Sequence, residues 1–186
     1  MKILNLLKPW VLAFYLKQLL LLKKNKGKLS IKGYRLSLEH TAQITIEGES
    51  KICFGQKTYL RKGTDVEAHN GAIVNIGDNF FMNKNSSIIA RYGIEIGDNC
   101  MIGENTTIID HNHVFKDPDL PFKDQGYQGA KITIGDNVWI AGQVFIGQGV
   151  SIGDNVVIGA NTIVTKDIPS NSIVYNKSTL VIKEIK

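Results

Sequence analysis

Aliphatic side chains recur at every sixth position between residues 131 and 168. An α-helix buries residues about 3.6 positions apart, and a strand on one core buries every second residue, so neither element gives this period. A period of six instead indicates a short strand followed by a turn, repeated many times. Such repeats are typical of a β-helix, in which each coil buries its aliphatic residues against its neighbours. One series is Ile134, Ile140, Ile146, Ile152, Ile158 and Val164, and the other is Val138, Val144, Val150, Val156, Thr162 and Ile168.

Small residues follow many of these aliphatic residues and predict the turns between the strands. Glycine adopts a positive φ without a Cβ clash, and Asp and Asn side chains bond to the backbone of their own turn. Four Gly-Asp-Asn corners fit this description, beginning at Gly77, Gly97, Gly135 and Gly153. If three hexapeptides close one coil, the stacked pairs are Ile134 on Ile152, Ile140 on Ile158 and Ile146 on Val164. A β-sandwich with Gly-rich turns is the alternative fold.

The repeat stops once in the middle of the chain. Residues 110–130 contain no hexapeptide but hold two histidines, His111 and His113, and the repeat resumes at Ile132. A long loop ejected from a regular scaffold commonly carries function, because it is free of the packing constraint. We therefore expect an active-site loop at 110–130, inserted without loss of the aliphatic core.

The N-terminal segment is strongly basic, although the chain as a whole has a net charge of only +5. Residues 1–38 contain nine basic residues and no acidic one, so the remaining chain has a net charge of −4. Basic and apolar residues are mixed here, with Lys17 and Gln18 interrupting the apolar run. No run is long enough to span a bilayer, and a secretory signal peptide lacks its cleavage site. We expect a basic amphipathic helix that either packs across the end of the β-helix or lies on the inner membrane leaflet.

The chain therefore divides into three expected parts. Residues 1–28 form the basic amphipathic helix, residues 29–168 form the β-helix, and residues 169–186 form a tail that packs back on the coils. The period of six is weak over residues 29–64, as expected of a terminal coil. Recognisable nucleic-acid-binding modules are absent from the sequence, which argues against that class of function.

Cys53 and Cys100 lie in repeat-like contexts where a small buried residue is expected. We interpret both as reduced core thiols of a cytoplasmic protein. We expect no metal site.

The stretch from Phe81 onward resembles the galactoside and maltose acetyltransferases, which are hexapeptide-repeat acyltransferases. The matching segments are Asn83-Lys84-Asn85, Ile96-Gly97-Asp98-Asn99, the histidine before Val114-Phe115, and Val138-Trp139-Ile140. The resemblance covers residues 70–186 and implies an all-β fold, a left-handed parallel β-helix. It also implies a homotrimer with its sites between neighbouring β-helices.

The resemblance implies a catalytic role for His113. In the family, the catalytic histidine follows the asparagine-rich segment by a fixed distance, which selects His113 rather than His111. Histidine is the natural base near neutral pH. It would take the proton from an acceptor hydroxyl that attacks acetyl-CoA directly, in a ternary complex. Asp110 either orients one of the two imidazole rings or caps the turn.

The acceptor and the cofactor each have candidate residues. Asn83 matches a residue that contacts the acceptor sugar, and Asn85 and His111 are further acceptor candidates. Arg91 stands where galactoside acetyltransferases carry an acidic residue, so it would suit an anionic sugar. The resemblance implies these contacts to acetyl-CoA: Trp139 as a wall for the pantetheine arm, a backbone N–H near Gly142 for the oxyanion, and Ala160, Thr165, Lys166, Lys177 and Lys183 along the CoA.

The leading hypothesis is an acetyl-CoA-dependent O-acetyltransferase for a bacterial surface polysaccharide or its lipid-linked precursor. The basic N-terminus motivates the lipid-linked acceptor and a peripheral contact with the cytoplasmic membrane. An alternative acetyltransferase would act on a free small molecule, a drug or a nucleotide-sugar. A zinc hydratase of the γ-carbonic anhydrase kind needs three imidazoles, and His111 and His113 supply two. A β-helix scaffold without catalysis is the remaining alternative.

Overall fold

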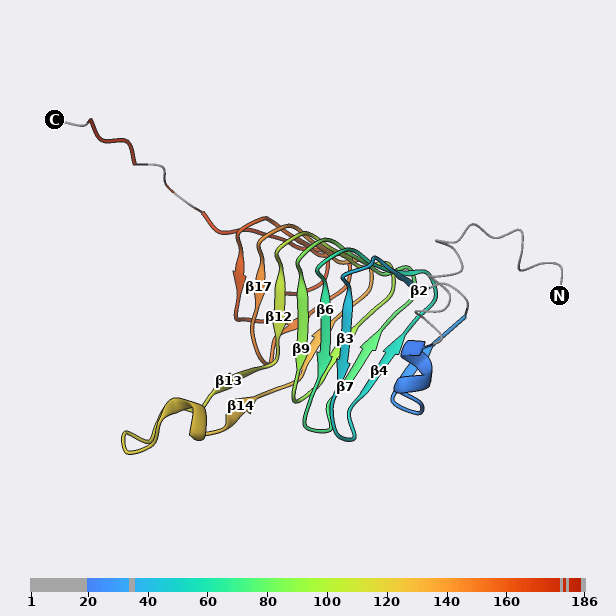
Figure 1. Cartoon of the computed structure of the whole chain (residues 1–186). Helices are drawn as coiled ribbons and strands as arrows, with labels where there is room; N and C mark the ends of the chain where they lie inside the picture. Colours follow the sequence, from blue (N-terminus) through green and yellow to red (C-terminus); the bar gives the residue numbers. More distant parts are fainter. Residues whose placement is uncertain (1–19, 34–35, 178, 180, 185–186) are drawn as a thin grey trace, which may run out of the picture.

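The computed structural model describes residues 20–33, 36–177, 179 and 181–184. In this part the chain is a parallel β-helix whose three faces are three sheets (Figure 1). The first sheet consists of β1 (Leu29–Ile31), β4 (Lys51–Phe54), β7 (Ile73–Ile76), β10 (Ile94–Ile96), β15 (Ile132–Ile134) and β18 (Ser151–Ile152). The expected fold class is thus confirmed.

The other two sheets follow in the same coil order. The second sheet consists of β2 (Leu36–Leu38), β5 (Thr58–Leu60), β8 (Phe81–Met82), β11 (Met101–Ile102), β16 (Trp139–Ile140), β19 (Val157–Ile158) and β21 (Ile173–Val174). The third sheet consists of β3 (Gln43–Ile46), β6 (Asp65–Ala68), β9 (Ser87–Ala90), β12 (Thr107–Ile109), β17 (Phe145–Ile146) and β20 (Ile163–Val164).

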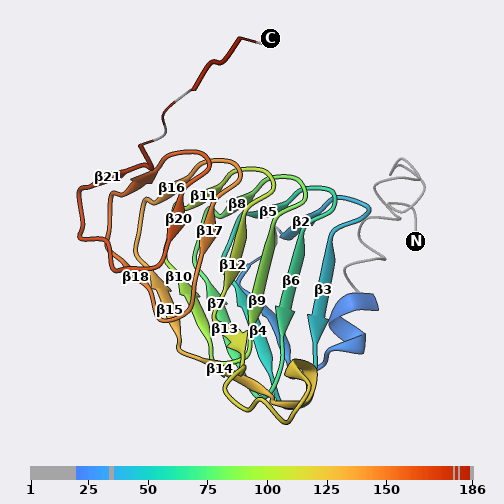
Figure 2. The ribbon, with the colours of Figure 1, turned by 90° about the vertical axis from the view of Figure 1, so that its left-hand side faces the viewer.

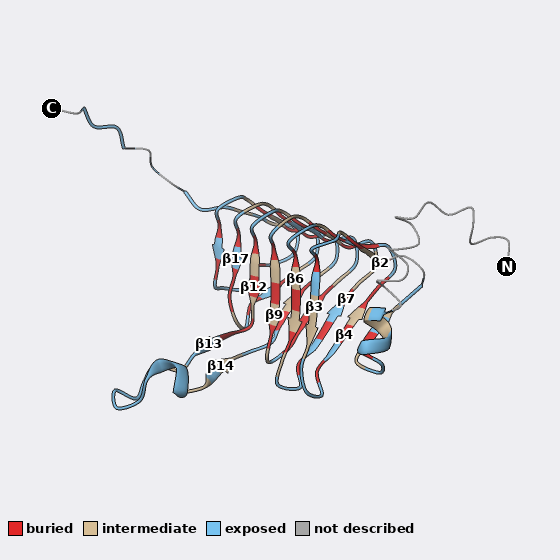
Figure 3. Cartoon of the chain, viewed as in Figure 1, coloured by how far each residue is buried: buried red, intermediate tan, exposed pale blue. Residues whose placement is uncertain are grey.

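The strand register confirms the stacking expected from the period of six. Ile134 pairs with Ile152, Ile140 with Ile158, and Ile146 with Val164. All six side chains are at most 4% exposed and belong to one core that fills the coils (Figure 3). Burying such a side chain contributes about 1.5–3 kcal/mol, so the stacked aliphatic residues are the main source of stability.

The coils become shorter from the N-terminal to the C-terminal end. Register partners are 22 residues apart between Ile52 and Val74, 20 apart between Val74 and Ile94, and 18 apart between Ile134 and Ile152. Only the 18-residue coil is a multiple of six. The extra residues in the early coils explain why the hexapeptide period is weak over residues 29–64.

The Gly-Asp-Asn corners work differently from the expectation. Positive φ falls on the asparagine, as at Asn99 and Asn137, and not on the glycine. The glycine is needed for close approach, because a Cβ on Gly97 would lie 2.2 Å from Asp136 Oδ1. That carboxylate oxygen accepts the Asp98 N–H at 2.7 Å, and the same bond recurs between other coils. Asn137 in turn donates to the next corner asparagine, Asn155, at 2.8 Å.

The insertion at 110–130 is an antiparallel hairpin that projects from one corner of the β-helix (Figures 1 and 2). Its strands are β13 (His111–His113) and β14 (Tyr127–Gly129), and a short 3-10 helix, η2 (Phe122–Asp124), lies near its tip. Ile94 still pairs with Ile132 across the insertion. The coils therefore continue in register, as expected of an ejected loop.

The two ends of the chain differ from each other. Residues 20–24 are helical, and Leu21 and Leu22 pack against the core. The greater part of the expected 1–28 helix lies outside the described residues. None of the described helices is long and apolar enough to cross a membrane.

The C-terminal tail does not pack back on the coils as expected. β21 adds a last strand beside β19, but beyond it the chain extends away from the β-helix (Figure 2). Val181 and Ile182 are 71% and 84% exposed. A single copy offers them no apolar partner, because the last coil has already buried its aliphatic residues inside.

Candidate active site

Three of the candidate residues meet at one aromatic ring on the hairpin, that of Tyr127. The Arg91 guanidinium carbon lies 3.8 Å from the centre of this ring, a cation–π distance. The His113 ring centre lies 4.4 Å from it, and the His111 ring stands edge-on at 5.2 Å. Backbone pairing of His113 with Tyr127 across the hairpin produces this arrangement. His113 is exposed on its outer side, whereas His111 is buried.

Asp110 both caps the turn and orients a histidine, so the two readings of this residue hold together. Its carboxylate is fully buried and accepts the backbone N–H groups of Arg91, Tyr92 and Gly93 at 2.6–3.1 Å. It also lies 2.9 Å from His111 Nδ1. The ring that it orients is that of His111, and His113 depends on the Tyr127 ring for its position.

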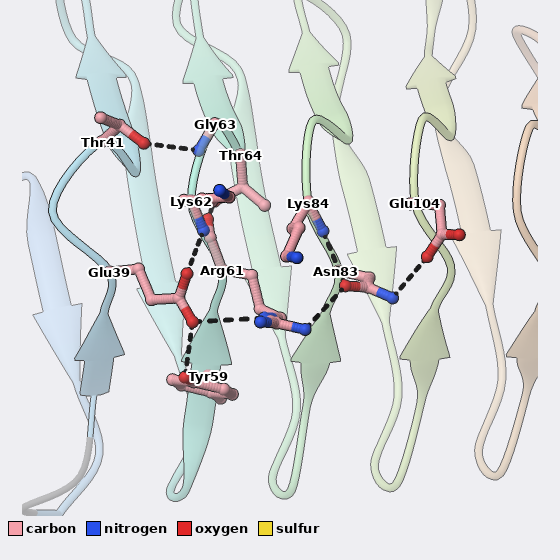
Figure 4. Close-up of polar contacts among 10 residues, drawn as sticks. All are labelled: Glu39, Thr41, Tyr59, Arg61, Lys62, Gly63, Thr64, Asn83, Lys84 and Glu104. Atoms are coloured by element: carbon pink, nitrogen blue, oxygen red, sulfur yellow. Dashed lines mark hydrogen bonds and ion pairs between the residues drawn. The ribbon is translucent and has the colours of Figure 1, made fainter.

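Asn83 lies far from the hairpin, at the corner between the second and third sheets (Figure 4). Its Oδ1 accepts the Lys84 N–H at 2.9 Å and Arg61 Nη1 at 3.4 Å, and its Nδ2 donates to Glu104 Oε2 at 2.8 Å. Arg61 is in turn ion-paired with Glu39 at 3.2 Å. Asn83 is therefore one member of a side-chain network that crosses four coils.

Glu39 anchors this network as a charged carboxylate. It accepts the Tyr59 O–H and the Lys62 N–H, both at 2.8 Å, besides Arg61 Nε. The Tyr59 hydroxyl, followed by the Lys62 N–H, lowers the pKa of Glu39 to about 2. The same bond raises the pKa of Tyr59. Glu39 thus stays ionised across the whole range in which a histidine base would work.

Asn85 has a corner role in the structure. It is one of the asparagines with positive φ (55°), and its Nδ2 faces Asn105 Oδ1 at 3.5 Å. Its side chain therefore repeats the asparagine stacking of the other corners. Contact between Asn85 and an acceptor remains a prediction.

Trp139 is not a core filler, because its side chain is 50% exposed on the outer face of the second sheet. It lies in register between Met101 and Val157. The row continues on both sides and contains only aromatic or aliphatic residues with exposed or partly exposed side chains: Tyr59, Phe81, Met101, Trp139, Val157 and Ile173. A contiguous exposed apolar row of this kind marks a surface that another molecule covers.

The other cofactor candidates are divided between two corners. Gly142 and Ala160 follow β16 and β19 at the Asn83 corner, and within the described part of the chain the Gly142 N–H donates to no backbone carbonyl. Thr165 and Lys166 follow β20 at the other end of the third sheet, beside a hollow of about 390 Å³. Lys177 and Lys183 lie on the extended tail, away from both corners.

The candidate residues thus form two groups at opposite ends of the third sheet. β9 joins the two ends in one coil, since Asn83 and Asn85 precede it and Arg91 follows it. At about 3.3 Å per residue, its four residues alone span roughly 13 Å. Asn83 and His113 of one copy therefore cannot contact the same sugar hydroxyl.

Sequence reasoning missed Tyr127, Arg61, Glu39 and Glu104. Tyr127 sits in the expected loop, in a Gly-Tyr-Gln-Gly segment whose turn residues could have indicated a hairpin. The other three lie at one corner only because the early coils are longer than 18 residues. Among the described residues, no group of His, Cys, Asp and Glu could hold a metal ion.

Comparison with known proteins agrees with the fold and with these segments. The family model described as bacterial transferase hexapeptide (six repeats) matches residues 131–166, and hexapeptide repeat of succinyl-transferase matches residues 73–109. Galactoside O-acetyltransferase of Escherichia coli is 44% identical over 115 residues, which cover 62% of this chain and 56% of that enzyme. The matched part of the chain thus spans little more than half of that relative's length.

Two solved structures extend the likeness. A maltose O-acetyltransferase from Clostridium difficile is 33% identical, with a TM-score of 0.56, and the match covers 92% of this chain and 76% of that one. AntD, an N-acyltransferase from Bacillus cereus, shares the fold at a TM-score of 0.70 and 20% identity, with 91% of this chain and 89% of that one covered. This chain therefore belongs to the hexapeptide-repeat acetyltransferases, in the group of the galactoside and maltose O-acetyltransferases.

Proposed function

We propose that this protein is an acetyl-CoA-dependent O-acetyltransferase that acetylates a sugar hydroxyl of a bacterial surface polysaccharide or its precursor. The observation that carries the proposal is the position of His113. A projecting hairpin presents its imidazole on the Tyr127 ring, beside the Arg91 guanidinium, on a scaffold that belongs to an acetyltransferase family. The solved galactoside-like and nucleotide-sugar relatives support a sugar acceptor, and AntD was solved with dTDP and coenzyme A.

The reaction needs only a base, an oxyanion donor and two aligned substrates. His113 takes the proton from the acceptor hydroxyl as its oxygen attacks the thioester carbonyl. The resulting oxyanion accepts a hydrogen bond from the free Gly142 N–H. The intermediate then collapses, the C–S bond breaks, and the CoA thiolate takes the proton from the imidazolium. The products are the O-acetyl sugar and CoA, and the histidine returns to its neutral form.

Acetyl-CoA is bound along the corners of the C-terminal coils. The exposed Trp139 indole forms a wall for the pantetheine arm, with Ala160 beside it on the next coil. The Lys166 ammonium matches the phosphates of CoA in charge, and Thr165 lies next to it at the mouth of the hollow.

The complete site lies between two copies of the chain in a homotrimer. Within one copy, the Asn83 corner and the His113 hairpin lie at opposite ends of the third sheet, so the two residues can serve one acceptor only if they come from different copies. The exposed apolar row on the second sheet, from Tyr59 to Ile173, supplies the surface that a neighbouring copy covers.

This arrangement predicts complementation between two inactive variants. Hetero-oligomers of His113→Ala and Asn83→Ala contain some sites that combine the intact histidine of one copy with the intact asparagine of the next. In a cyclic trimer assembled at random, about a quarter of the sites are restored. Coexpression with two different tags, tandem purification and an activity assay measure this. Tandem-purified heteromers as inactive as the parent variants would place the whole site in one copy.

Two features point to the acceptor. The Arg91 guanidinium near His113 suits an anionic sugar such as a uronic or sialic acid. The basic N-terminal segment suits a lipid-linked acceptor at the cytoplasmic face of the membrane, where each basic residue near anionic lipid adds about 1 kcal/mol. Leu21 and Leu22 pack against the core. A truncation that tests the membrane contact should therefore end before residue 20.

Release of free thiol from acetyl-CoA tests the function. The panel contains neutral, amino and acidic sugars, their oligosaccharides, and short-chain lipid-linked analogues. Sugar-dependent release, fastest with an acidic or lipid-linked acceptor, is the expected result. Full turnover with a free drug or nucleotide-sugar would favour the small-molecule acetyltransferase. Absence of both turnover and CoA binding would leave a β-helix scaffold.

A further inference from the structure

The hydrogen-bonding groups around Asn83 leave two of them unused, and these two lie side by side. Glu39, Arg61, Asn83 and Glu104 occupy the same corner of four successive coils (Figure 4). Each coil places its polar side chain about 4.8 Å from the next. The question is which of their donors and acceptors remain available to a ligand.

The charges on either side fix the orientation of the Asn83 amide. Arg61 Nη1 and the Lys84 N–H are donors, so the atom that faces them must be the carbonyl oxygen. Glu104 carries a carboxylate, so the atom that faces it must be the amide nitrogen. A flipped amide would set N–H against N–H on one side and oxygen against carboxylate on the other.

Counting bonds then shows what the site still offers. The Asn83 oxygen has two lone pairs and both are used, whereas its Nδ2 has two hydrogens and one is used. Glu104 is exposed, and within the described part of the chain its Oε1 has no hydrogen-bond partner. One N–H donor and one carboxylate acceptor therefore remain, joined by the bond between their own side chains.

A donor and a carboxylate acceptor on neighbouring side chains match two adjacent hydroxyl groups. The Asn83 N–H donates to one hydroxyl oxygen, and Glu104 Oε1 accepts the hydrogen of the next hydroxyl. A carboxylate ligand is disfavoured at this point because Glu104 would repel it. An anionic group of the acceptor therefore has to lie elsewhere, and the Arg91 hairpin of the neighbouring copy offers the opposite charge.

We propose that Glu104 is an acceptor-binding residue that, together with Asn83, recognises two neighbouring hydroxyl groups of the sugar, and that Arg61 and Glu39 are positioning residues for Asn83. This inference rests on the proposed function for its choice of ligand. Glu104 also lies one coil before Gly142, whose Cα hydrogen points toward the Glu104 backbone oxygen and Cγ. The hydroxyl pair is thus held next to the oxyanion donor.

Glu104→Gln tests the proposal, since it keeps the shape of the side chain but removes the charge. We expect the KM for the sugar to rise roughly 10- to 100-fold, as for loss of a hydrogen bond to a charged group. The KM for acetyl-CoA and the thermal midpoint stay unchanged. Glu49→Gln, which changes an exposed glutamate on another corner, is the matched control. Equal changes in both KM values, or no change in either, would overturn the assignment.

Deoxy sugars locate the contact. The probes are methyl galactoside and its single deoxy derivatives. One deoxy position should weaken the parent protein roughly as much as Glu104→Gln does, and the variant should lose nothing further with that sugar. Additive losses at every position would contradict a direct contact.

Arg61→Lys separates positioning from binding. It keeps the positive charge but loses the fork that joins Glu39 to Asn83. We expect a rise in the sugar KM, a smaller one than for Glu104→Gln, at every deoxy position alike. An unchanged sugar KM would remove Arg61 from the proposal.

Saturation-transfer NMR with methyl galactoside separates failure of this inference from failure of the proposed function. Binding that weakens in Glu104→Gln supports the sugar site even when no acetyl transfer occurs. Equal binding by parent and variant overturns the inference even if the protein is an active acetyltransferase.

Discussion

His113→Ala should lower kcat by about 10²- to 10⁴-fold, the usual loss for a missing general base. The reason is that the variant removes the imidazole that the hairpin presents to the acceptor hydroxyl, while the coils beneath it keep their register across the insertion. Acetyl-CoA affinity and the thermal midpoint should change little, because His113 is exposed and lies outside the core. Thiol release at saturating acceptor and isothermal titration with CoA measure the two quantities.

Two further variants make the result specific. His40→Ala changes an exposed histidine of an early coil and should keep the activity of the parent. His111→Ala is the informative comparison, since His111 has the Asp110 carboxylate behind its Nδ1. A full loss in His111→Ala together with an active His113→Ala would transfer the base to the His111–Asp110 pair.

Asp110→Asn should lower the free energy of unfolding by about 3 kcal/mol or more. The buried carboxylate accepts three backbone N–H groups of the 91–93 corner and the His111 ring. The amide has one oxygen for these donors and turns its own N–H₂ toward the rest. A buried donor without a partner costs about 1–3 kcal/mol, and bonds to a charged acceptor are the stronger ones.

Chemical denaturation at one fixed protein concentration measures this loss, because subunit association contributes to stability. Asp124→Asn, an exposed change on the same hairpin, is the control and should stay within about 0.5 kcal/mol of the parent. An Asp110→Asn variant as stable as this control would show that water or the backbone replaces the lost acceptor.

The regular coils could be predicted from the sequence because one physical constraint determines them. Each inward position must be aliphatic, so Ile134 and Ile152 reveal both the period and the stacking. The corners were harder, since glycine and asparagine share the work. Glycine allows the coils to approach, and the asparagine two positions later takes the positive φ.

The site could be predicted only as far as the local sequence carries it. The hairpin was recognisable as a break in the repeat, and its two histidines were visible within it. The ring of Tyr127 and the bond between Asn83 and Glu104 were not, because they depend on which residues face each other across a hairpin or between coils. Coil length sets that register, and 22-, 20- and 18-residue coils are not distinguishable from a pattern of six.

The change in coil length also bears on self-association of the solenoid. The first coils are 22 residues around, whereas the last bridge joins Ile152 to Ile168, only 16 residues later. Both ends of a parallel β-helix expose unpaired backbone groups that could template another copy. A wide first coil and a narrow last coil cannot match strand for strand, and Leu21 and Leu22 already pack at the wide end. The taper therefore acts against fibre growth, so copies of the chain associate through their sides rather than end to end.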